Sequence, residues 1–341
     1  MTCLVKVKNY AISLCLLTGI VSTVDASPKI ENVSGEASEG STITIFGSEF
    51  SRVDNKKTLY DQVDNQTIYD NLAHGTPVPL NQGLWTTRAS KWGNPIEIVR
   101  SGDLRTDGAS AAYFGLRKAE LGYPSILSDS QTRELYVSWW FKPSKAVDQG
   151  GSNKFIRIWD RNDGEGTRIS WTQMHMTHTS PSPSWNQTQP TPEKWNRFEI
   201  HVDSDSNTIT ARLNGKVKHS ETNFVKAPNS EGLDIRLIGF DPSESTPYSD
   251  YSFRMKDIYF SETQARVEVS ASPTWDLESH REVLQPLNWS DSSIEVVLEK
   301  FSFDQFDNLY VYVIDQEGNV NDQGYPLCGD CPSSPTVITI D

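Results

Sequence analysis

The feature that most constrains the fold is a long series of short segments in which apolar and polar residues alternate. This period of two is typical of β-strands, because successive side chains of a strand point to opposite faces of the sheet. No stretch of convincing length shows a helical period, so the sequence predicts an all-β sandwich. The predicted strands of the middle of the chain are 58–60, 111–115, 134–142, 154–160, 167–176, 197–203, 208–213, 216–221, 234–240 and 252–261.

The two ends of the chain carry two halves of another strand pattern. Alternation also marks 29–33 and 41–46 near the start, and 266–270, 293–298 and 309–314 near the end. Pro28-x-Ile30-x-x-Val33-x-Gly35, followed by Gly40-x-x-Ile43-x-Ile45-x-Gly47-x-x-Phe50, resembles the opening of an IPT/TIG domain. The stretch Trp289-Ser-Asp-Ser-Ser-Ile294-x-Val296 and the segment 309–320 resemble its later part. The resemblance implies a small immunoglobulin-like sandwich that is split between residues 27–54 and 263–327.

The middle, residues 55–262, is expected to be a domain inserted into the split one. Insertion is tolerated where a surface loop is replaced by a domain whose ends lie close together. Leu135-Tyr-Val-Ser-Trp-Trp-Phe141, Trp195-Asn-Arg-Phe-Glu-Ile-His-Val202 and Met255-Lys-Asp-Ile-Tyr-Phe-Ser261 resemble strands of the concanavalin A-like jelly roll. Laminin-G-type lectin modules and several polysaccharide-acting enzymes, lyases among them, share this fold. Asn214-Gly215 predicts a type I′ hairpin between two of its strands.

Candidate binding residues concentrate in the segment 153–178, where the period of two places unusual side chains on one face. Flat rings and fork-shaped or amide hydrogen-bonding groups are what a sugar ring requires of a protein. Arg197 of a neighbouring strand is expected to extend this row, although a solvated face with charge pairs is the alternative for it. Trp185, on the Pro/Ser/Gln loop 180–191, is either a sugar platform or an anchor of a lid. The candidates within 153–178 are Arg157, Trp159, Trp171, Gln173 and His175.

A catalytic alternative starts from Gln173-Met174-His175. This triplet resembles the Gln-x-His element of jelly-roll alginate lyases. The resemblance implies that Gln173 and Arg157 or Arg197 neutralise a uronate carboxylate, that His175 removes the C5 proton, and that a tyrosine acts as acid. The chain departs from that family in lacking its Arg-rich strand and its Tyr/Lys/Gly/Tyr strand. The paired-carboxylate strand of retaining glycosidases is also missing.

The leading prediction is therefore a protein that binds a polysaccharide or cell-surface glycan on the concave face of the jelly roll. A polysaccharide lyase that acts by β-elimination on a uronate-containing polymer is the alternative, and a structural or adhesive surface module is the second. The sequence does not decide whether the protein is an enzyme, and it favours a protein without catalytic activity. If it is one, the predicted class is polysaccharide lyase.

Charge and acidic clusters bear on partners and cofactors. The chain carries 45 acidic and 31 basic residues, and its net charge of -14 makes nucleic acid an unlikely partner. An acidic polysaccharide would need a local basic cleft to overcome this field. No cofactor is expected, and the histidines are too scattered for a zinc site. A structural calcium ion is conceivable at 160–165 or 241–250, where solvated turn acids are the commoner explanation.

The remaining predictions concern export and the cysteines. Residues 1–26 are interpreted as a signal peptide, because Lys6 and Lys8 precede a short apolar run and small residues precede Ser27. The run is too short for a convincing membrane span. Cys328 and Cys331 could form a metal half-site, but a local disulfide in an oxidising compartment fits better. Residues 328–341 are expected to form a C-terminal tail, and the mature protein to be secreted, periplasmic or on the cell surface.

Overall fold

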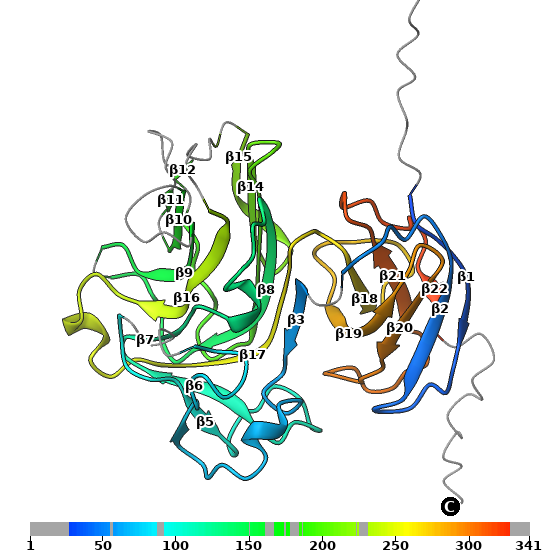
Figure 1. Ribbon diagram of the computed structural model, residues 1–341. Coiled ribbons are helices and arrows are strands. Elements are labelled where there is room, and N and C mark those ends of the chain that lie inside the picture. Colours follow the sequence, from blue (N-terminus) through cyan, green and yellow to red (C-terminus); the bar gives the residue numbers. More distant parts are fainter. Residues whose placement is uncertain are drawn as a thin grey trace, which may run out of the picture.

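The molecule consists of two β-sandwiches that lie side by side (Figure 1). This computed structural model describes residues 27–54, 57–86, 92–149, 151–160, 167–173, 175–177, 184–185, 187–222, 224 and 231–327. Within those ranges every regular element is a strand or a short 3-10 helix. The all-β prediction is confirmed. The larger sandwich is a jelly roll made by the middle of the chain, and the smaller is a single curled sheet made by both ends.

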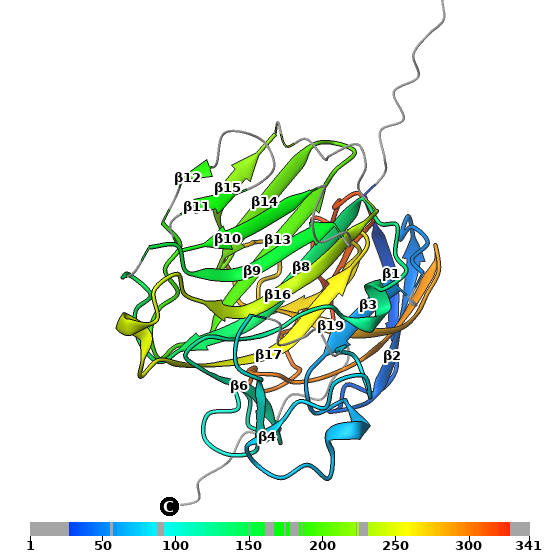
Figure 2. The same cartoon turned by 60° about the vertical axis from the view of Figure 1, so that its left-hand side comes forward.

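Two antiparallel sheets form the jelly roll, and Figure 2 shows them stacked. The nine-stranded sheet has the order β15 (Lys216–Glu221), β14 (Thr208–Leu213), β13 (Asn196–Asp203), β8 (Glu134–Pro143), β17 (Ser252–Ser261), β6 (Ala112–Leu116), β5 (Glu97–Val99) and β4 (Thr76–Pro77), with β3 (Thr58–Asp61) paired to β17. The six-stranded sheet has the order β12 (Ser184–Trp185), β11 (His175–Thr177), β10 (Arg168–Thr172), β9 (Lys154–Asp160), β16 (Leu233–Asp241) and β7 (Ala119–Leu121). The short helices are η2 (Thr67–Tyr69), η3 (Ser125–Leu127) and η4 (Thr246–Tyr248).

Aromatic rings fill the space between the two jelly-roll sheets. Trp139 of β8 stacks on Phe198 of β13, with ring centroids 5.0 Å apart. Trp171 of β10 packs edge-on against the same Phe198 at 5.0 Å. Each of these strands alternates inward and outward side chains, so the rings of both sheets interdigitate in one core. This core fixes which residues of β9, β10, β8 and β13 are left for the outer faces.

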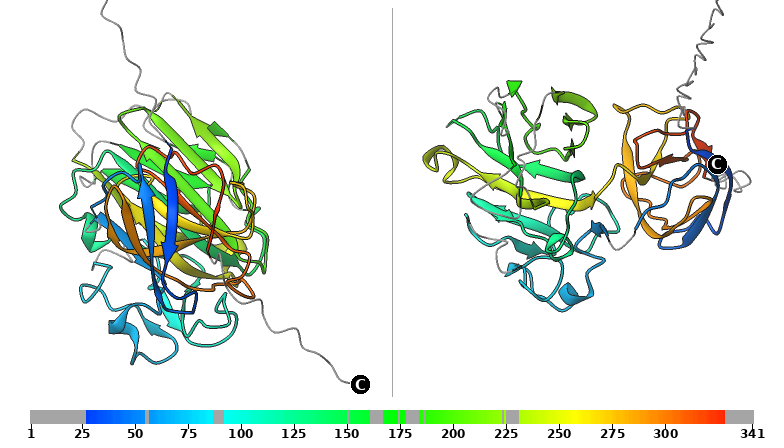
Figure 3. Two further views of the ribbon diagram at one scale, coloured as in Figure 1. Left: turned by 90° about the vertical axis from the view of Figure 1, so that its right-hand side faces the viewer. Right: turned by 45° about the horizontal axis from the view of Figure 1, so that its top comes forward.

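The second sandwich joins strands from both ends of the chain. Its seven-stranded sheet has the order β1 (Lys29–Ser34), β2 (Thr42–Ser48), β20 (Ser293–Val297), β19 (Arg281–Trp289), β18 (Arg266–Ser270), β21 (Tyr310–Ile314) and β22 (Tyr325–Pro326). Ile45 of β2 lies opposite Ile294 of β20. The Trp289 indole donates to the carbonyl of Phe50 at 3.0 Å, which ties the strands of the two ends together. Figure 3 shows this lobe beside the jelly roll.

Most predicted strands match the structure closely, and the differences have local causes. The predicted strand 167–176 is interrupted, because β10 ends at Thr172 and β11 begins at His175. β19 was not predicted; it contains Pro286, and its register with β20 shifts at that point. The Asn214-Gly215 hairpin is confirmed, since both residues have positive φ, 50° and 76°.

Candidate functional site

The outward row of β9 is the starting point of the candidate site. Lys154, Arg157 and Trp159 are partly exposed, whereas Ile156 and Ile158 are fully buried in the core. β10 continues this face, because Ser170 pairs with Arg157 and Arg168 with Trp159. The outer face of the six-stranded sheet therefore combines basic and aromatic side chains, and the strands that carry them lie side by side in Figure 2.

Trp92, from the segment that precedes β5, completes an aromatic corner over β9. Its ring meets that of Trp159 edge to face, with centroids 5.7 Å apart. The Arg157 guanidinium lies 5.2 Å from the Trp92 centroid and 5.4 Å from that of Trp159. Arg168 adds a second guanidinium 5.1 Å from the Trp159 ring. We call Trp92, Arg157, Trp159 and Arg168 the tryptophan–arginine face.

Ion pairs hold the basic groups of this face in position. The Arg157 guanidinium bonds Asp241 Oδ2 at 2.8 Å, and Lys118 bonds Oδ1 of the same carboxylate at 2.8 Å. Asp241 therefore balances only one of these two charges. Lys154, in the same outward row, donates from Nζ to the carbonyl of Ser152 at 2.9 Å. The described residues of the face thus present more positive than negative charge.

Glu120 lies beneath Trp92 and supports the corner. Its Oε1 accepts the Trp92 backbone N–H at 2.6 Å. Burial, reinforced by the nearby charge of Asp241, raises the pKa of Glu120 to about 7. At neutral pH this carboxyl is therefore partly protonated, which lessens the negative charge under the face.

Trp171 does not belong to the tryptophan–arginine face, and the prediction that it does is wrong. It is fully buried, and its indole donates to Thr188 Oγ1 at 3.2 Å. β10 pairs with β9 so that Ser170, not Trp171, lies beside Arg157. Trp171 consequently faces the core and offers no surface to a ligand.

Gln173 is also engaged within the protein. It is 2% exposed, and its Oε1 accepts the N–H of Asn153 at 2.6 Å. Its amide nitrogen donates to the carbonyl of Gly151. The break after β10 turns the side chain toward the backbone at the start of β9, so the predicted ligand contact of Gln173 is wrong.

Arg197 lies on the opposite side of the jelly roll, where the second sandwich covers it. It is 5% exposed, and its guanidinium bonds Glu268 of β18 at 2.8 Å and the carbonyl of Arg281 of β19 at 2.8 Å. Glu268 also binds Arg266 and Arg281. The alternation of β13 is as predicted, but its polar row faces the smaller sandwich of the same chain. The predicted ligand-binding role of Arg197 is therefore wrong.

Other predicted residues are placed only in part. His175 and Trp185 pair through their backbones across β11 and β12, and their side chains lie outside the described ones. The signal peptide, the Cys328–Cys331 pair, the tail and most of the acidic turn 160–165 fall outside the described residues too. In the described part of the chain, no three His, Cys, Asp or Glu residues are arranged to hold a metal ion.

The sequence analysis missed five residues of the site: Trp92, Lys118, Glu120, Arg168 and Asp241. Trp92 stands in the turn-like stretch Lys-Trp-Gly-Asn-Pro, and a bulky ring among turn residues was the available signal. Glu120 and Asp241 gave no such signal, because acidic residues at strand ends are commonly solvated.

No known family model matches the sequence, and no curated protein matches it. Among solved structures, the alginate lyase Aly36B is similar at 12% identity and a TM-score of 0.37, over 60% of this chain and 96% of that one. Domain 4 of AbnA, a GH43 extracellular arabinanase from Geobacillus stearothermophilus, is similar at 15% identity and a TM-score of 0.34, over 50% and 76%. The PL-14 alginate lyase from Aplysia kurodai is similar at 10% identity and a TM-score of 0.34, over 48% and 86%.

Among the described residues no helix is both long enough and apolar enough to span a membrane.

Proposed function

We propose that the protein recognises a polysaccharide, without catalysis, through the tryptophan–arginine face. The observation that carries the proposal is the Trp92–Trp159 corner with two guanidinium groups within 5.5 Å of its rings, at 5.2 and 5.1 Å. Aromatic rings and guanidinium forks are the groups that contact sugar rings and their hydroxyl or acidic substituents. The ion pairs of Arg157 and Lys118 with Asp241 fix the array before a ligand arrives, which lowers the entropic cost of binding.

The charge of this face favours an anionic glycan. Lys118 and Arg157 share the single carboxylate of Asp241, so a uronate or sulfated chain meets a local positive charge despite the net charge of -14. Such a potential acts within about a Debye length of roughly 8 Å at physiological salt. Binding should therefore weaken as salt is added.

The lyase alternative receives less support from the geometry. The oxygen and the nitrogen of the Gln173 amide both bond backbone groups, so this side chain is not available to neutralise a carboxylate. Arg197, a second candidate for that role, is paired with Glu268 beneath the smaller sandwich. His175, or Trp185 as a stacking platform, stays a prediction for this edge of the sheet.

We further propose that the smaller sandwich is an IPT/TIG-like immunoglobulin-like domain, formed by residues 27–54 and 263–327, into which the jelly roll is inserted. The pairing of β2 with β20 supports this division. We also propose that residues 1–26 direct export of the protein and that Cys328 and Cys331 form a disulfide after export. A mass decrease of two hydrogens relative to reduced protein would test the disulfide.

Affinity electrophoresis and calorimetry test the function directly. Alginate, polyguluronate, hyaluronan and heparin should bind with salt-sensitive affinity, and Trp159→Ala should weaken that binding about fivefold or more, since an aromatic contact contributes about 1 kcal/mol. Trp195→Ala is the matched control, because Trp195 is a partly exposed ring of the same jelly roll whose indole bonds Asp103, away from this face.

The same polymers, followed by ultraviolet absorbance, separate binding from lysis. Absorbance should stay constant with wild type. A steady rise that His175→Ala abolishes would replace recognition with β-elimination, and binding that Trp159→Ala leaves intact would remove the proposed face.

A further inference from the structure

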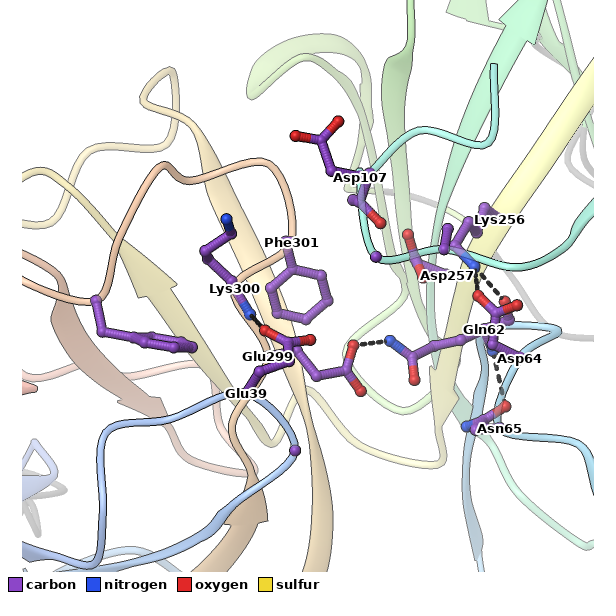
Figure 4. A pocket seen from close by; sticks show the side chains of 15 residues that line it. Glu39, Gln62, Asp64, Asn65, Asp107, Lys256, Asp257, Glu299, Lys300 and Phe301 are labelled. Atoms are coloured by element: carbon purple, nitrogen blue, oxygen red, sulfur yellow. Dashed lines mark hydrogen bonds and ion pairs between the residues drawn. The ribbon is translucent and has the colours of Figure 1, made fainter. Parts of the chain in front are cut away.

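A cleft with a volume of about 570 Å³ lies between the two sandwiches. This volume is within the range of roughly 300–1,000 Å³ that small-molecule sites occupy. Residues of both sandwiches contribute to it, as Figure 4 shows. The smaller sandwich contributes Glu39, Glu299 and Phe306 among others, and the jelly roll contributes Gln62, Asp107 and Lys256.

Internal bonds position the walls of the cleft. Lys256 is 3% exposed, and its Nζ donates to the carbonyl of Gln62 at 2.7 Å and to the Asp64 carboxylate. The Gln62 amide donates to Glu299, which joins the two walls. On the smaller sandwich, Glu39 accepts the Lys300 backbone N–H at 2.8 Å. Groups held in this way need little reordering when a ligand binds.

Asp257 supplies an acceptor that the protein leaves unused. It is 6% exposed, and its Oδ2 is bound by Arg105. Oδ1 is buried and, among the described residues, has no hydrogen-bond partner. A buried carboxylate oxygen without a donor is costly. Asp257 borders both the cleft and a small enclosed space beside Tyr60 and Glu282, and a ligand reaches Oδ1 only if the side chain moves. Asp257 also has a φ of 51° within the register shift of β17, the kind of bulge that re-aims a side chain.

The charge of the cleft differs from that of the tryptophan–arginine face. Lys256 is matched by Asp64, and Asp257 by Arg105. The remaining charged lining groups are Glu39 and Asp107 against Lys300, together with Glu299, whose pKa is raised by burial to about 7. The cleft is therefore negative, which repels uronates and sulfates. Carboxylate and amide oxygens accept from hydroxyl groups, and the partly exposed Phe306 adds an apolar ring.

We infer that this cleft is a second binding site, which takes a short hydroxyl-rich oligosaccharide carrying no negative charge, with the carboxylates and amides that line the cleft accepting from ligand hydroxyls. The site is separate from the tryptophan–arginine face and opposite to it in charge. The inference about the cleft does not depend on whether the tryptophan–arginine face binds an acidic polymer.

Gly108 offers a direct test, because its added Cβ would meet no atom within 4 Å and its φ is not positive. Gly108→Trp should fill the cleft without disturbing the fold. Glu244→Trp, on an exposed loop that does not line the cleft, is the matched control. Each variant is checked by thermal unfolding, and Gly108→Leu replaces the Trp variant if that one fails to fold.

The probes are tri- to hexasaccharides of glucose, mannose and xylose, chitosan oligomers, and guluronate oligomers, with binding followed by calorimetry. At least one neutral or amine-bearing series should bind wild type and Glu244→Trp equally. Gly108→Trp should lose at least tenfold in affinity. Binding of guluronate oligomers alone, binding that survives Gly108→Trp, or no binding of any neutral or amine-bearing oligomer would each overturn the inference.

Discussion

The two outer faces of the jelly roll carry the same types of residue, but one face is open to solvent and the other is covered by the smaller sandwich. On the six-stranded sheet, Arg157 and Trp159 stay partly exposed, and one carboxylate, Asp241, serves two cations. On the nine-stranded sheet, Arg197 and Glu199 are 5% and 3% exposed and are surrounded by charges of the smaller sandwich. Polar outward rows thus become either a recognition surface or a buried interface, depending on what covers them.

The covered face depends on complete charge pairing. Glu268 is fully buried and is bound by Arg197, Arg266 and Arg281. Burial alone raises the pKa of Glu268, but the three guanidinium groups hold it well below its ordinary value. A second cluster joins Arg105 of the jelly roll to Glu282 of β19 at 2.8 Å. Exposed pairs have water as an alternative partner, whereas these have none.

The largest effect should come from Glu268→Gln. It leaves three buried guanidinium groups with one carboxylate fewer and should lower the free energy of unfolding by about 3–5 kcal/mol. Urea denaturation measures it. Glu278→Gln is the control, because the Glu278–Lys216 pair is mostly exposed and is expected to contribute under about 1 kcal/mol. Equal effects of the two substitutions would mean that the covered face is energetically no different from the surface.

The second-largest effect is expected from acid, which should weaken the ion pairs between the jelly roll and the smaller sandwich. Burial raises the pKa of Glu282, but the charges of Arg105 and His280 outweigh it and lower that pKa to about 2. The folded pKa lies below the ordinary value of 4.5, so this stabilisation is present above pH 4.5 and is lost as the pH falls toward 2. Glu282→Gln should therefore reduce stability at pH 7 and converge with wild type near pH 2. Chemical denaturation across that range measures it, and parallel curves would contradict it.

A smaller effect of opposite sign is expected beneath the exposed face. The pKa of Glu120 is raised to about 7, so this group stabilises the fold below pH 4.5 and loses that contribution as the pH rises through 7. Glu120→Gln should thus gain melting temperature relative to wild type at pH 8 but not at pH 4. The Gln oxygen can still accept the Trp92 N–H. A variant that loses stability equally at both values would assign Glu120 a purely structural role.

The smallest stability effect belongs to the exposed face itself. Arg168 is exposed, so Arg168→Gln should change the free energy of unfolding by less than about 0.5 kcal/mol while weakening binding of acidic glycans several-fold. Arg133→Gln is its control, since Arg133 is an exposed arginine paired with Asp205 elsewhere on the jelly roll. Calorimetry with alginate compares the two. A loss of stability without a loss of affinity would show that Arg168 only buttresses Trp159.

Alternation of apolar and polar residues was enough to predict most strands, but it could not predict which parts of the molecule pack against each strand. It correctly placed Arg197 and Glu199 on an outward row of β13, yet nothing local shows that β18 and β19 cover that row. It failed at Trp171, because the pairing of β10 with β9 decides which residues share a face, and register is set by distant packing. Trp92 and Asp241 reach the site from other segments, so no window of sequence contains their contacts with Arg157.

The pairing of β2 with β20 also sets an order of events during synthesis. Phe46 pairs with Ser293, so β2 waits for roughly 250 residues to be made before its neighbour exists. At about 5–20 residues per second, that delay lasts roughly 12–50 s. The jelly roll lies wholly within the interval and can complete its sheets first, which brings the two flanks together. Until then the edge of β2 that will pair with β20 is open, and during this interval another chain could pair with it.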